Sequence, residues 1–253
     1  MEKVSEGCLA NEDEDGYDAV VVGSGYGGSV TACRMSMAGI KVCLLERGRR
    51  WEAEDFPTDS LKMLSTFRIE NRNLGIGFGP SDALIQVIPS SLPIYDEAIA
   101  LYKIQVNIQG DSLSAIACGL GGGSLVNAGV MKPTPVRAKR NPKWPKEWEG
   151  GWEICEASAS AMLRIQTVPT KFPNAKVMDE VAGEESEETN QTSVKLSINF
   201  DVEEQKSNSR KTREPGSCLA CGNCLSGCPY NAKNSTDKNY LVSAIQVRYP
   251  SEY

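Results

Sequence analysis

The chain has 253 residues, of which 40% are hydrophobic and 24% charged, which is typical of a globular protein with a sizeable core. No stretch approaches the roughly eighteen consecutive apolar residues of a membrane-spanning helix, and the acidic N-terminus is unlike a signal or transit peptide. We therefore expect an intracellular, cytoplasmic protein with no transmembrane segment.

The net charge of −6 is concentrated in two acidic stretches. Residues 1–20 carry seven acids against Lys3, and residues 179–188 carry six acids and no base. The rest of the chain is mildly basic, which suits an anionic ligand, although an ordinary solvated surface explains it equally well. We expect residues 1–16 to form a disordered acidic leader and residues 179–188 to be solvated. The sequence has no run of basic residues interspersed with aromatic ones, which is the pattern that would predict binding to nucleic acid.

The best-formed local pattern lies near the N-terminus. Residues 19–22 are a short apolar run with three valines, typical of a strand buried on both faces, and residues 42–45 have the same character. Between them, a glycine-rich break is followed by a helical pattern over residues 29–38, which Gly39 ends. A strand, a helix and a second strand in this order predict a βαβ unit and a parallel sheet.

The break between the first strand and the helix has the pattern G-x-G-x-x-G, in residues 23–28. In dinucleotide-binding proteins its glycines form a tight turn, let the backbone approach a diphosphate and let the helix approach the strand. The helix N-terminus then faces the phosphates, and an acid at the end of the second strand binds a ribose. The pattern predicts dinucleotide binding without separating FAD from NAD. The predicted cofactor-binding residues here are Gly23, Gly25, Tyr26, Gly27, Gly28 and Glu46.

A second glycine-rich stretch, GLGGGSLVNAG, occupies residues 119–129. Three consecutive glycines, residues 121–123, leave the backbone bare, so a flat ring or a phosphate can approach it closely. Ser124 and Asn127 add side chains that can hydrogen-bond to such a ligand. By itself the stretch is equally well explained as a loop between two elements.

The remaining elements are less sharply defined. Residues 51–95 are rich in Gly, Pro and Ser and predict loops with one short helix near residues 60–67. Residues 113–117 have the character of a strand, and residues 152–165 have helical spacing. In residues 193–202 the apolar side chains alternate strictly, which predicts a half-buried strand of an antiparallel sheet.

Four cysteines, Cys218, Cys221, Cys224 and Cys228, follow the spacing C-x2-C-x2-C-x3-C, with Pro229 next. This is the spacing with which bacterial ferredoxins hold an iron–sulfur cluster. A [4Fe–4S] cluster, a tetrahedral zinc site and a structural turn with free thiols are all compatible with it. The spacing alone favours a metal site with these four residues as ligands.

Three stretches together resemble one family. The stretches "VVVGSGYGGSV…LLERG", "GLGGGSLVNAGVM" and "CGNCLSGCPYNAKNSTDKNYL" occur in the order found in glucose–methanol–choline (GMC) type FAD oxidoreductases of the cholesterol-oxidase-like branch. The resemblance runs from about Tyr17 to Ala244 and corresponds to the N-terminal part of that family. It implies an α/β fold with a Rossmann-like FAD-binding domain and its parallel sheet in residues 17–150. Residues 151–253 would be part of an inserted α+β substrate-binding domain with antiparallel strands.

The resemblance also implies a cofactor and a reaction. FAD would lie extended across the domain, with Gly122, Gly123, Ser124 and Asn127 near its pyrophosphate and isoalloxazine. The substrate would be a sterol or a long-chain alcohol whose CH–OH group gives a hydride to the flavin, and an acceptor such as oxygen would take the electrons. Related Cys- and Gly-rich stretches recur in flavoenzymes of this branch that use FAD alone, which lowers the expectation of a [4Fe–4S] cluster.

The sequence departs from the family in one respect that bears on catalysis, because it contains no histidine. The family's histidine handles the substrate hydroxyl and lies near the end of a considerably longer chain. We therefore expect a truncated chain that by itself binds FAD weakly and does not turn over alcohols. The alternatives are an electron-transfer protein that pairs a flavin with an iron–sulfur cluster, and an FAD-binding remnant without catalysis.

Overall fold

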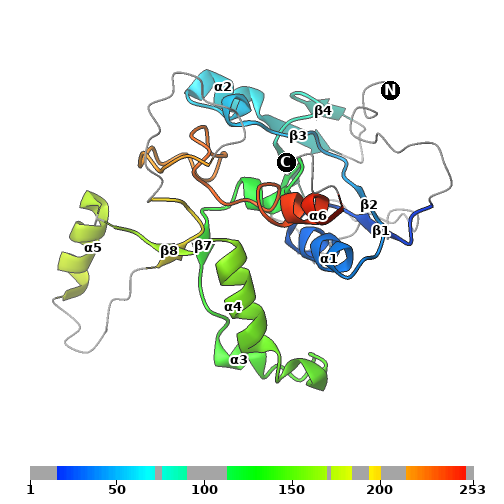
Figure 1. Cartoon of the computed structure of the whole chain (residues 1–253). Coiled ribbons are helices and arrows are strands. Elements are labelled where there is room, and N and C mark those ends of the chain that lie inside the picture. The colour runs from blue at the N-terminus through cyan, green and yellow to red at the C-terminus, as the bar shows by residue number, and fades with distance from the viewer. Residues whose placement is uncertain are drawn as a thin grey trace.

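The computed structural model describes residues 16–71, 76–89, 113–169, 172–183, 194–200 and 215–248. These residues form a mixed α/β structure with three small sheets. Helices α1 (Tyr26–Met37) and α6 (Tyr240–Arg248) lie side by side (Figure 1). The predicted acidic leader lies almost entirely outside the described residues, as do the end of the second acidic stretch and the end of the alternating segment. Within the described residues, no helix is long and apolar enough to cross a membrane.

The predicted βαβ unit is present. Strands β1 (Ala19–Val22) and β2 (Val42–Leu45) pair in parallel. Helix α1 (Tyr26–Met37) connects them and begins earlier than predicted, because Gly25 already holds the extended conformation of an N-cap residue. After the helix, Gly39 has a φ of 82°, the left-handed conformation that favours glycine and ends a helix.

The structure differs from the expectation that both strands are buried on both faces. The side chains alternate along β1, and Val20 and Val22 are 60% and 64% exposed. In β2, Leu45 is 52% exposed. The physical reason is that, among the described residues, this sheet has only two strands and packs against α1, so that alternate side chains of β1 face solvent.

Three of the four strands of a second sheet lie where the sequence predicts loops and one short helix. Its order is β4-β3-β5-β6, with β3 and β5 parallel and the other neighbours antiparallel. Its strands are β3 (Phe67–Asn71), β4 (Ile76–Phe78), β5 (Ile85–Pro89) and β6 (Leu113–Ala117). The last of these confirms the predicted strand, and α2 (Ser60–Ser65) confirms the short helix, which the Asp59 carboxylate caps. One turn of 3-10 helix, η1 (Ala53–Asp55), precedes it.

The third sheet is antiparallel, as predicted, but smaller. Its strands, in the order β7-β9-β8, are β7 (Val130–Met131), β9 (Lys195–Leu196) and β8 (Gln166–Thr167). In its described part the alternating segment therefore forms only a two-residue strand, and Val194 is half exposed. The chain leaves the sheet because Ile198 and Asn199 pair instead with Lys233 and Ala232.

The described residues contain several further helical elements. Helix α4 (Trp152–Met162) confirms the helical spacing of its segment, and α5 (Pro173–Gly183) shows that the second acidic stretch begins inside a helix. The remaining helical elements are η3 (Gly122–Leu125), α3 (Val136–Lys139), η4 (Lys146–Trp148) and α6 (Tyr240–Arg248). In Figure 1, α5 lies far from α1 and α6.

Two apolar clusters hold the described elements together. The first consists of Trp51, Phe56, Leu84, Ile85 and Leu125. The second consists of Cys33 of α1, Leu163 after α4 and Tyr240 of α6. Because the second cluster packs α6 against α1, the segment before α6 lies beside the glycine turn that precedes α1.

Candidate cofactor site

The first glycine turn, residues 23–28, connects β1 to α1. Gly23 has a φ of 88°, a conformation in which a residue with a side chain is strained. The N–H and the hydroxyl of Ser24 both donate to Oε2 of Glu46, at 2.8 and 2.6 Å, and the N–H of Gly48 donates to Oε1 at 2.9 Å. The Glu46 carboxylate therefore ties the glycine turn to the end of β2.

The second glycine turn, residues 119–125, packs directly on the first. A Cβ atom added to Gly122 would lie 2.8 Å from the Cα atom of Gly25. The N–H of Gly121 donates to Ser24 Oγ at 2.8 Å, although these residues are 97 positions apart. Gly121 and Gly122 have φ values of 109° and 54°, so both positions favour glycine. The two glycine stretches are thus neighbours, as a single cofactor that contacts both requires.

The backbone of both turns faces open space. Cβ atoms added to Gly25, Gly27 and Gly123 would meet no described atom within 4 Å. No side chain caps α1 at Gly25, and the first turn of α1 contains no acid. The N–H groups and the positive end of the helix dipole are therefore available to an anion. These features fit the diphosphate of a dinucleotide, which needs close backbone approach and N–H donors.

A third segment, residues 233–239, completes the site; it lies in the third stretch that carries the family resemblance, but none of its residues was predicted to bind the cofactor. Thr236 is fully buried, its N–H donates to Ser124 Oγ at 3.0 Å, and its hydroxyl lies 3.3 Å from the carbonyl oxygen of Ser24. Ser124 Oγ donates to the carbonyl oxygen of Gly121 at 2.7 Å. The signal that could have found this segment is the polar run NSTDKN before a helix, because such residues favour helix N-termini.

Two predicted cofactor residues contact each other. Asn127 Nδ2 donates to the Tyr26 hydroxyl at 2.7 Å, and Asn127 Oδ1 accepts from the N–H of Gly129 at 3.0 Å. Burial raises the pKa of Tyr26 above its ordinary value, and the hydrogen bond from Asn127 opposes this only partly. The pair fixes the second glycine loop against α1. The hydrogen bonds of Ser124 and Asn127 are with protein groups, and their contact with a ligand stays a prediction.

Asp237 is a buried residue beside the second glycine turn. It is 7% exposed, and its Oδ1 would lie 3.1 Å from a Cβ atom on Gly121. Among the described residues nothing hydrogen-bonds to this oxygen. Burial raises the pKa of Asp237, while the Ser235 hydroxyl and Lys238 act in the opposite direction. Since a buried oxygen without a partner is costly, this is a place where a polar ligand group would be accommodated.

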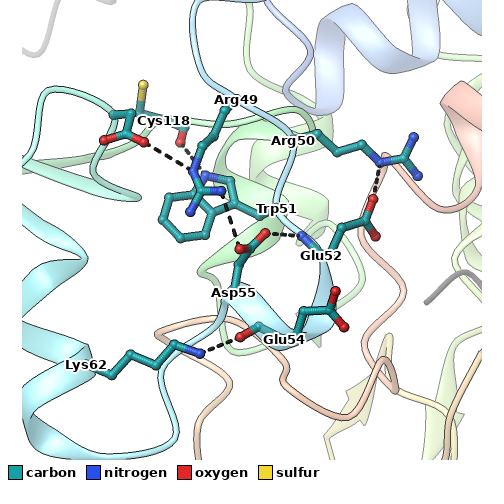
Figure 2. Close-up of polar contacts among 9 residues, drawn as sticks. Arg49, Arg50, Trp51, Glu52, Glu54, Asp55, Lys62 and Cys118 are labelled. Carbon is teal, nitrogen blue, oxygen red and sulfur yellow. Dashed lines mark hydrogen bonds and ion pairs between the residues drawn. The ribbon is translucent and has the colours of Figure 1, made fainter. Parts of the chain in front are cut away.

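The segment after Glu46 is held by a cluster around Arg49 and Trp51 (Figure 2). The Arg49 guanidinium lies 3.8 Å from the centre of the Trp51 ring and pairs with Asp55 and Asp82, each at 3.4 Å. Trp51 Nε1 donates to the carbonyl oxygen of Cys118 at 3.2 Å. The cluster therefore joins the end of β2 to the end of β6, from which the second glycine turn begins.

The structure gives no support to a metal site at the four cysteines. Among the described residues, which include all four, no group of three or more His, Cys, Asp or Glu side chains is arranged to hold a metal ion. Cys218 Sγ accepts from the N–H of Ala220 at 3.4 Å, and Cys228 Sγ accepts from that of Ala232 at 3.3 Å. Burial raises the pKa of the Cys218 and Cys224 thiols above its ordinary value. The iron–sulfur interpretation is therefore unsupported, and a structural turn fits this geometry.

Comparison with known proteins finds relatives of the chain. The family model described as GMC oxidoreductase matches residues 17–248. The chain is 29% identical to a cholesterol oxidase of Acinetobacter baumannii, over 90% of this chain and 38% of that protein. It is 27% identical to a cholesterol oxidase of Mycobacterium tuberculosis, over 89% of this chain and 36% of that protein. It is 26% identical to the long-chain-alcohol oxidase FAO4B of Arabidopsis thaliana, over 94% of this chain and 26% of that protein.

The match covers all three segments of the site. It includes both glycine turns and continues to the end of α6. The chain spans between 26% and 38% of the length of the three relatives. Members of the matched family bind FAD, a dinucleotide of the kind that the two glycine turns fit. The chain belongs to the GMC oxidoreductase family.

Proposed function

We propose that this chain supplies the FAD-binding part of an oxidoreductase that acts on the CH–OH group of a sterol or a long-chain alcohol. The observation that carries the proposal is the contact of Gly122 with Gly25, beside backbone that faces open space. Two glycine turns in contact can share one extended dinucleotide. The substrate class rests on the relatives, which are named cholesterol oxidase and long-chain-alcohol oxidase.

In this proposal the first turn holds the adenosine diphosphate. Gly23 and Gly25 allow the backbone to approach it, and the N–H groups at the start of α1 offset the phosphate charge. The Glu46 carboxylate accepts hydrogen bonds from ribose hydroxyls, and its negative charge disfavours a 2′-phosphate. Gly28 lets the helix approach the turn, because a Cβ atom there would overlap the carbonyl oxygen of Gly23.

The second turn holds the flavin half of the cofactor. Gly122 and Gly123 offer bare backbone, Ser124 keeps the turn closed through its hydrogen bond to Gly121, and Asn127 is fixed by Tyr26. When bound, FAD supplies the ring that accepts a hydride from the alcohol carbon. The hydroxyl proton of the alcohol needs a positioned base, and we assign that role to no described residue of this histidine-free chain.

Three further features belong to the proposal at the level of the whole protein. We place the FAD-binding part in residues 17–150 and part of the substrate-binding domain in residues 151–253, except that residues 233–248 complete the cofactor site and pack α6 against α1. The electron acceptor is a small molecule such as oxygen. No observation favours the iron–sulfur electron-transfer alternative over this assignment, since the described cysteines form no metal-holding group.

The test is FAD binding by the Gly25→Ala variant. Gly25 has φ and ψ of −62° and −173°, which alanine adopts readily, and its Cβ atom would meet no described atom within 4 Å. The fold should therefore be unchanged, while the added methyl group occupies the space of the cofactor. We expect FAD binding to weaken at least about tenfold in a titration followed by flavin fluorescence.

Gly150→Ala is the matched control for this variant. Its Cβ atom would also meet open space, in the turn between η4 and α4. The control should bind FAD as the unaltered chain does, and both variants should keep the melting temperature of the unaltered chain. Equal FAD affinity of Gly25→Ala and the control would place the cofactor elsewhere and contradict the proposal.

A further inference from the structure

Lys233 is a buried lysine to which the proposed function gives no role. It is 3% exposed and follows the four cysteines in the sequence. Its ammonium group donates to the carbonyl oxygens of Leu125 and Cys224, both at 2.9 Å, and to that of Asn127. Leu125 ends η3 and Asn127 follows it, both in the second glycine loop, residues 119–129. Cys224 lies in the cysteine-rich loop, residues 218–228. One side chain therefore joins two loops from the inside.

The chemistry of this contact is that of a positioning group. An ammonium group has three N–H donors, and here three carbonyl oxygens accept from it. Because a buried charge without partners is expensive, these acceptors are what allow a lysine here. Burial lowers the pKa of Lys233 to about 8, while Cys224 and Cys228 oppose that shift. At neutral pH the group is thus mostly an ammonium, which has no lone pair with which to accept a proton.

Two of the three carbonyl groups belong to the loop assigned to the flavin. The N–H groups of Val126 and Asn127 donate to the carbonyl oxygen of Gly123, so the turn closes on itself there. Leu125 packs in the first apolar cluster, and the Asn127 side chain holds Tyr26. Fixing the carbonyl groups of Leu125 and Asn127 therefore fixes the course of this loop beside α1.

The cysteine-rich loop presents the third carbonyl group from a well-anchored position. On one side of Cys224, Asn223 Nδ2 donates to the carbonyl oxygen of Pro57 at 2.9 Å. On the other side, a Cβ atom on Gly227 would overlap the ring of Phe56, so the loop lies directly against the first apolar cluster. A lysine held by this loop is consequently held in a defined place relative to the core.

We propose that Lys233 is a positioning residue of the flavin site, whose ammonium group clamps the second glycine loop onto the cysteine-rich loop. The inference rests on the proposed function, because the clamped loop is the one assigned to the flavin half of FAD. It also gives the cysteine-rich loop a role that needs no metal, namely the mechanical support of the cofactor loop.

The first test measures the clamp without any cofactor. Hydrogen–deuterium exchange is compared between the unaltered chain and Lys233→Met, which keeps an unbranched side chain one atom shorter and removes the donors. We expect the amides of Val126, Asn127 and Gly129 to exchange at least about tenfold faster, while those of α1 keep their rates. Lys195→Met, which alters an exposed lysine of β9, is the control and should change neither.

Two outcomes of this test would overturn the proposal. Unchanged exchange in the loop would show that the ammonium group does not hold it. Equal acceleration throughout the chain would show that Lys233 serves the general stability of the fold rather than this loop.

The second test is FAD titration of the same proteins together with Lys233→Gln, which keeps two N–H donors without the charge. We expect binding to be weakest in Lys233→Met, intermediate in Lys233→Gln and unchanged in Lys195→Met. If the unaltered chain binds FAD and Lys233→Met binds it equally well, the positioning role fails while the proposed function stands. If the unaltered chain and Gly25→Ala bind FAD equally, the proposed function fails, and faster loop exchange in Lys233→Met still establishes the clamp.

If Lys233→Met does not fold, the unaltered chain decides the question. An ammonium group buried against three carbonyl oxygens exchanges its protons slowly with water. It should therefore give a cross-peak in a nitrogen–proton correlation NMR spectrum at neutral pH. Through-bond NMR experiments would assign this cross-peak to the side chain of Lys233. The absence of that signal would overturn the proposal.

Discussion

Ser24 is the residue at which the three segments of the candidate site meet. Its hydroxyl donates to Glu46 and accepts from the N–H of Gly121, and its carbonyl oxygen accepts from the Ser29 hydroxyl at 2.6 Å. The carbonyl oxygen also lies 3.3 Å from the Thr236 hydroxyl. Because Ser24 is fully buried, water cannot replace these partners. At the scale of single residues, the site thus depends on one hydroxyl group between two glycines.

Ser24→Ala should therefore destabilise the chain measurably. The variant leaves the buried N–H of Gly121 without its acceptor, and such a group costs about 1–3 kcal/mol. We expect a loss of this size in the free energy of unfolding measured with urea. Ser81→Ala, in an exposed turn, is the control and should change that free energy by less than about 0.5 kcal/mol. Equal losses in the two variants would show that the glycine turns do not depend on this hydrogen bond.

At the scale of elements, one acid attaches α4 to the segment around α3. Glu156 Oε2 accepts from Lys139 Nζ at 2.8 Å, and Oε1 accepts from the N–H of Thr134 at 2.9 Å. The hydrogen bond from Lys139, followed by those from Thr134, lowers the pKa of Glu156 from 4.5 to about 2. The ionised carboxylate therefore contributes to this attachment, alongside the contacts of Trp152 with Trp144 and Trp148.

The pH dependence of Glu156→Gln tests this attachment. Because the folded-state pKa lies below the unfolded-state value, the stability that the carboxylate contributes is complete above about pH 4.5 and is lost as the pH falls toward about 2. The melting temperature of Glu156→Gln should lie below that of the unaltered chain near neutral pH. The difference between the two melting temperatures should shrink as the pH falls from about 4.5 toward about 2. Glu153→Gln, exposed on the same helix, is the control and should show a difference that varies less with pH. A constant difference for Glu156→Gln would contradict the argument.

At the scale of the whole molecule, the parallel sheet leaves apolar side chains open to solvent. Val20, Val22 and Leu45 are all more than half exposed on β1 and β2. Exposed strands that carry apolar side chains promote association between chains. We therefore expect the chain, purified as it stands, to self-associate through this surface.

A double variant, Val20→Thr with Val22→Thr, tests the role of that surface. Threonine keeps the β-branched shape that suits a strand and adds a hydroxyl that favours water. We expect association in analytical ultracentrifugation to require several-fold higher protein concentration, with little change in melting temperature. Val194→Thr, at a half-exposed position before β9, is the control and should associate as the unaltered chain does. Unchanged association of the double variant would place the contact on another surface.

The sequence predicted the local parts of this structure and missed those that depend on distant partners. The βαβ unit and the turn at residues 23–28 follow from apolar runs and glycines that are close together in the chain. Strands β3 and β5 were not predicted, because what makes them strands is their pairing with each other and, for β5, also with β6. The strand at residues 193–202 was predicted too long, because Asn199 bonds to Ala232 instead of continuing the sheet.

The sequence by itself determined the βαβ unit, the two glycine stretches and the resemblance to an FAD-binding family. Only the tertiary structure decided that Gly122 lies against Gly25 and that Lys233 reaches Leu125, 108 residues away. It also showed that, in the part of the chain that the structure describes, the four cysteines are not arranged as a group that could hold a metal ion. The physical reason is one of range. Periodicity and turn chemistry act over a few neighbouring residues, whereas contacts between loops depend on how all the segments pack.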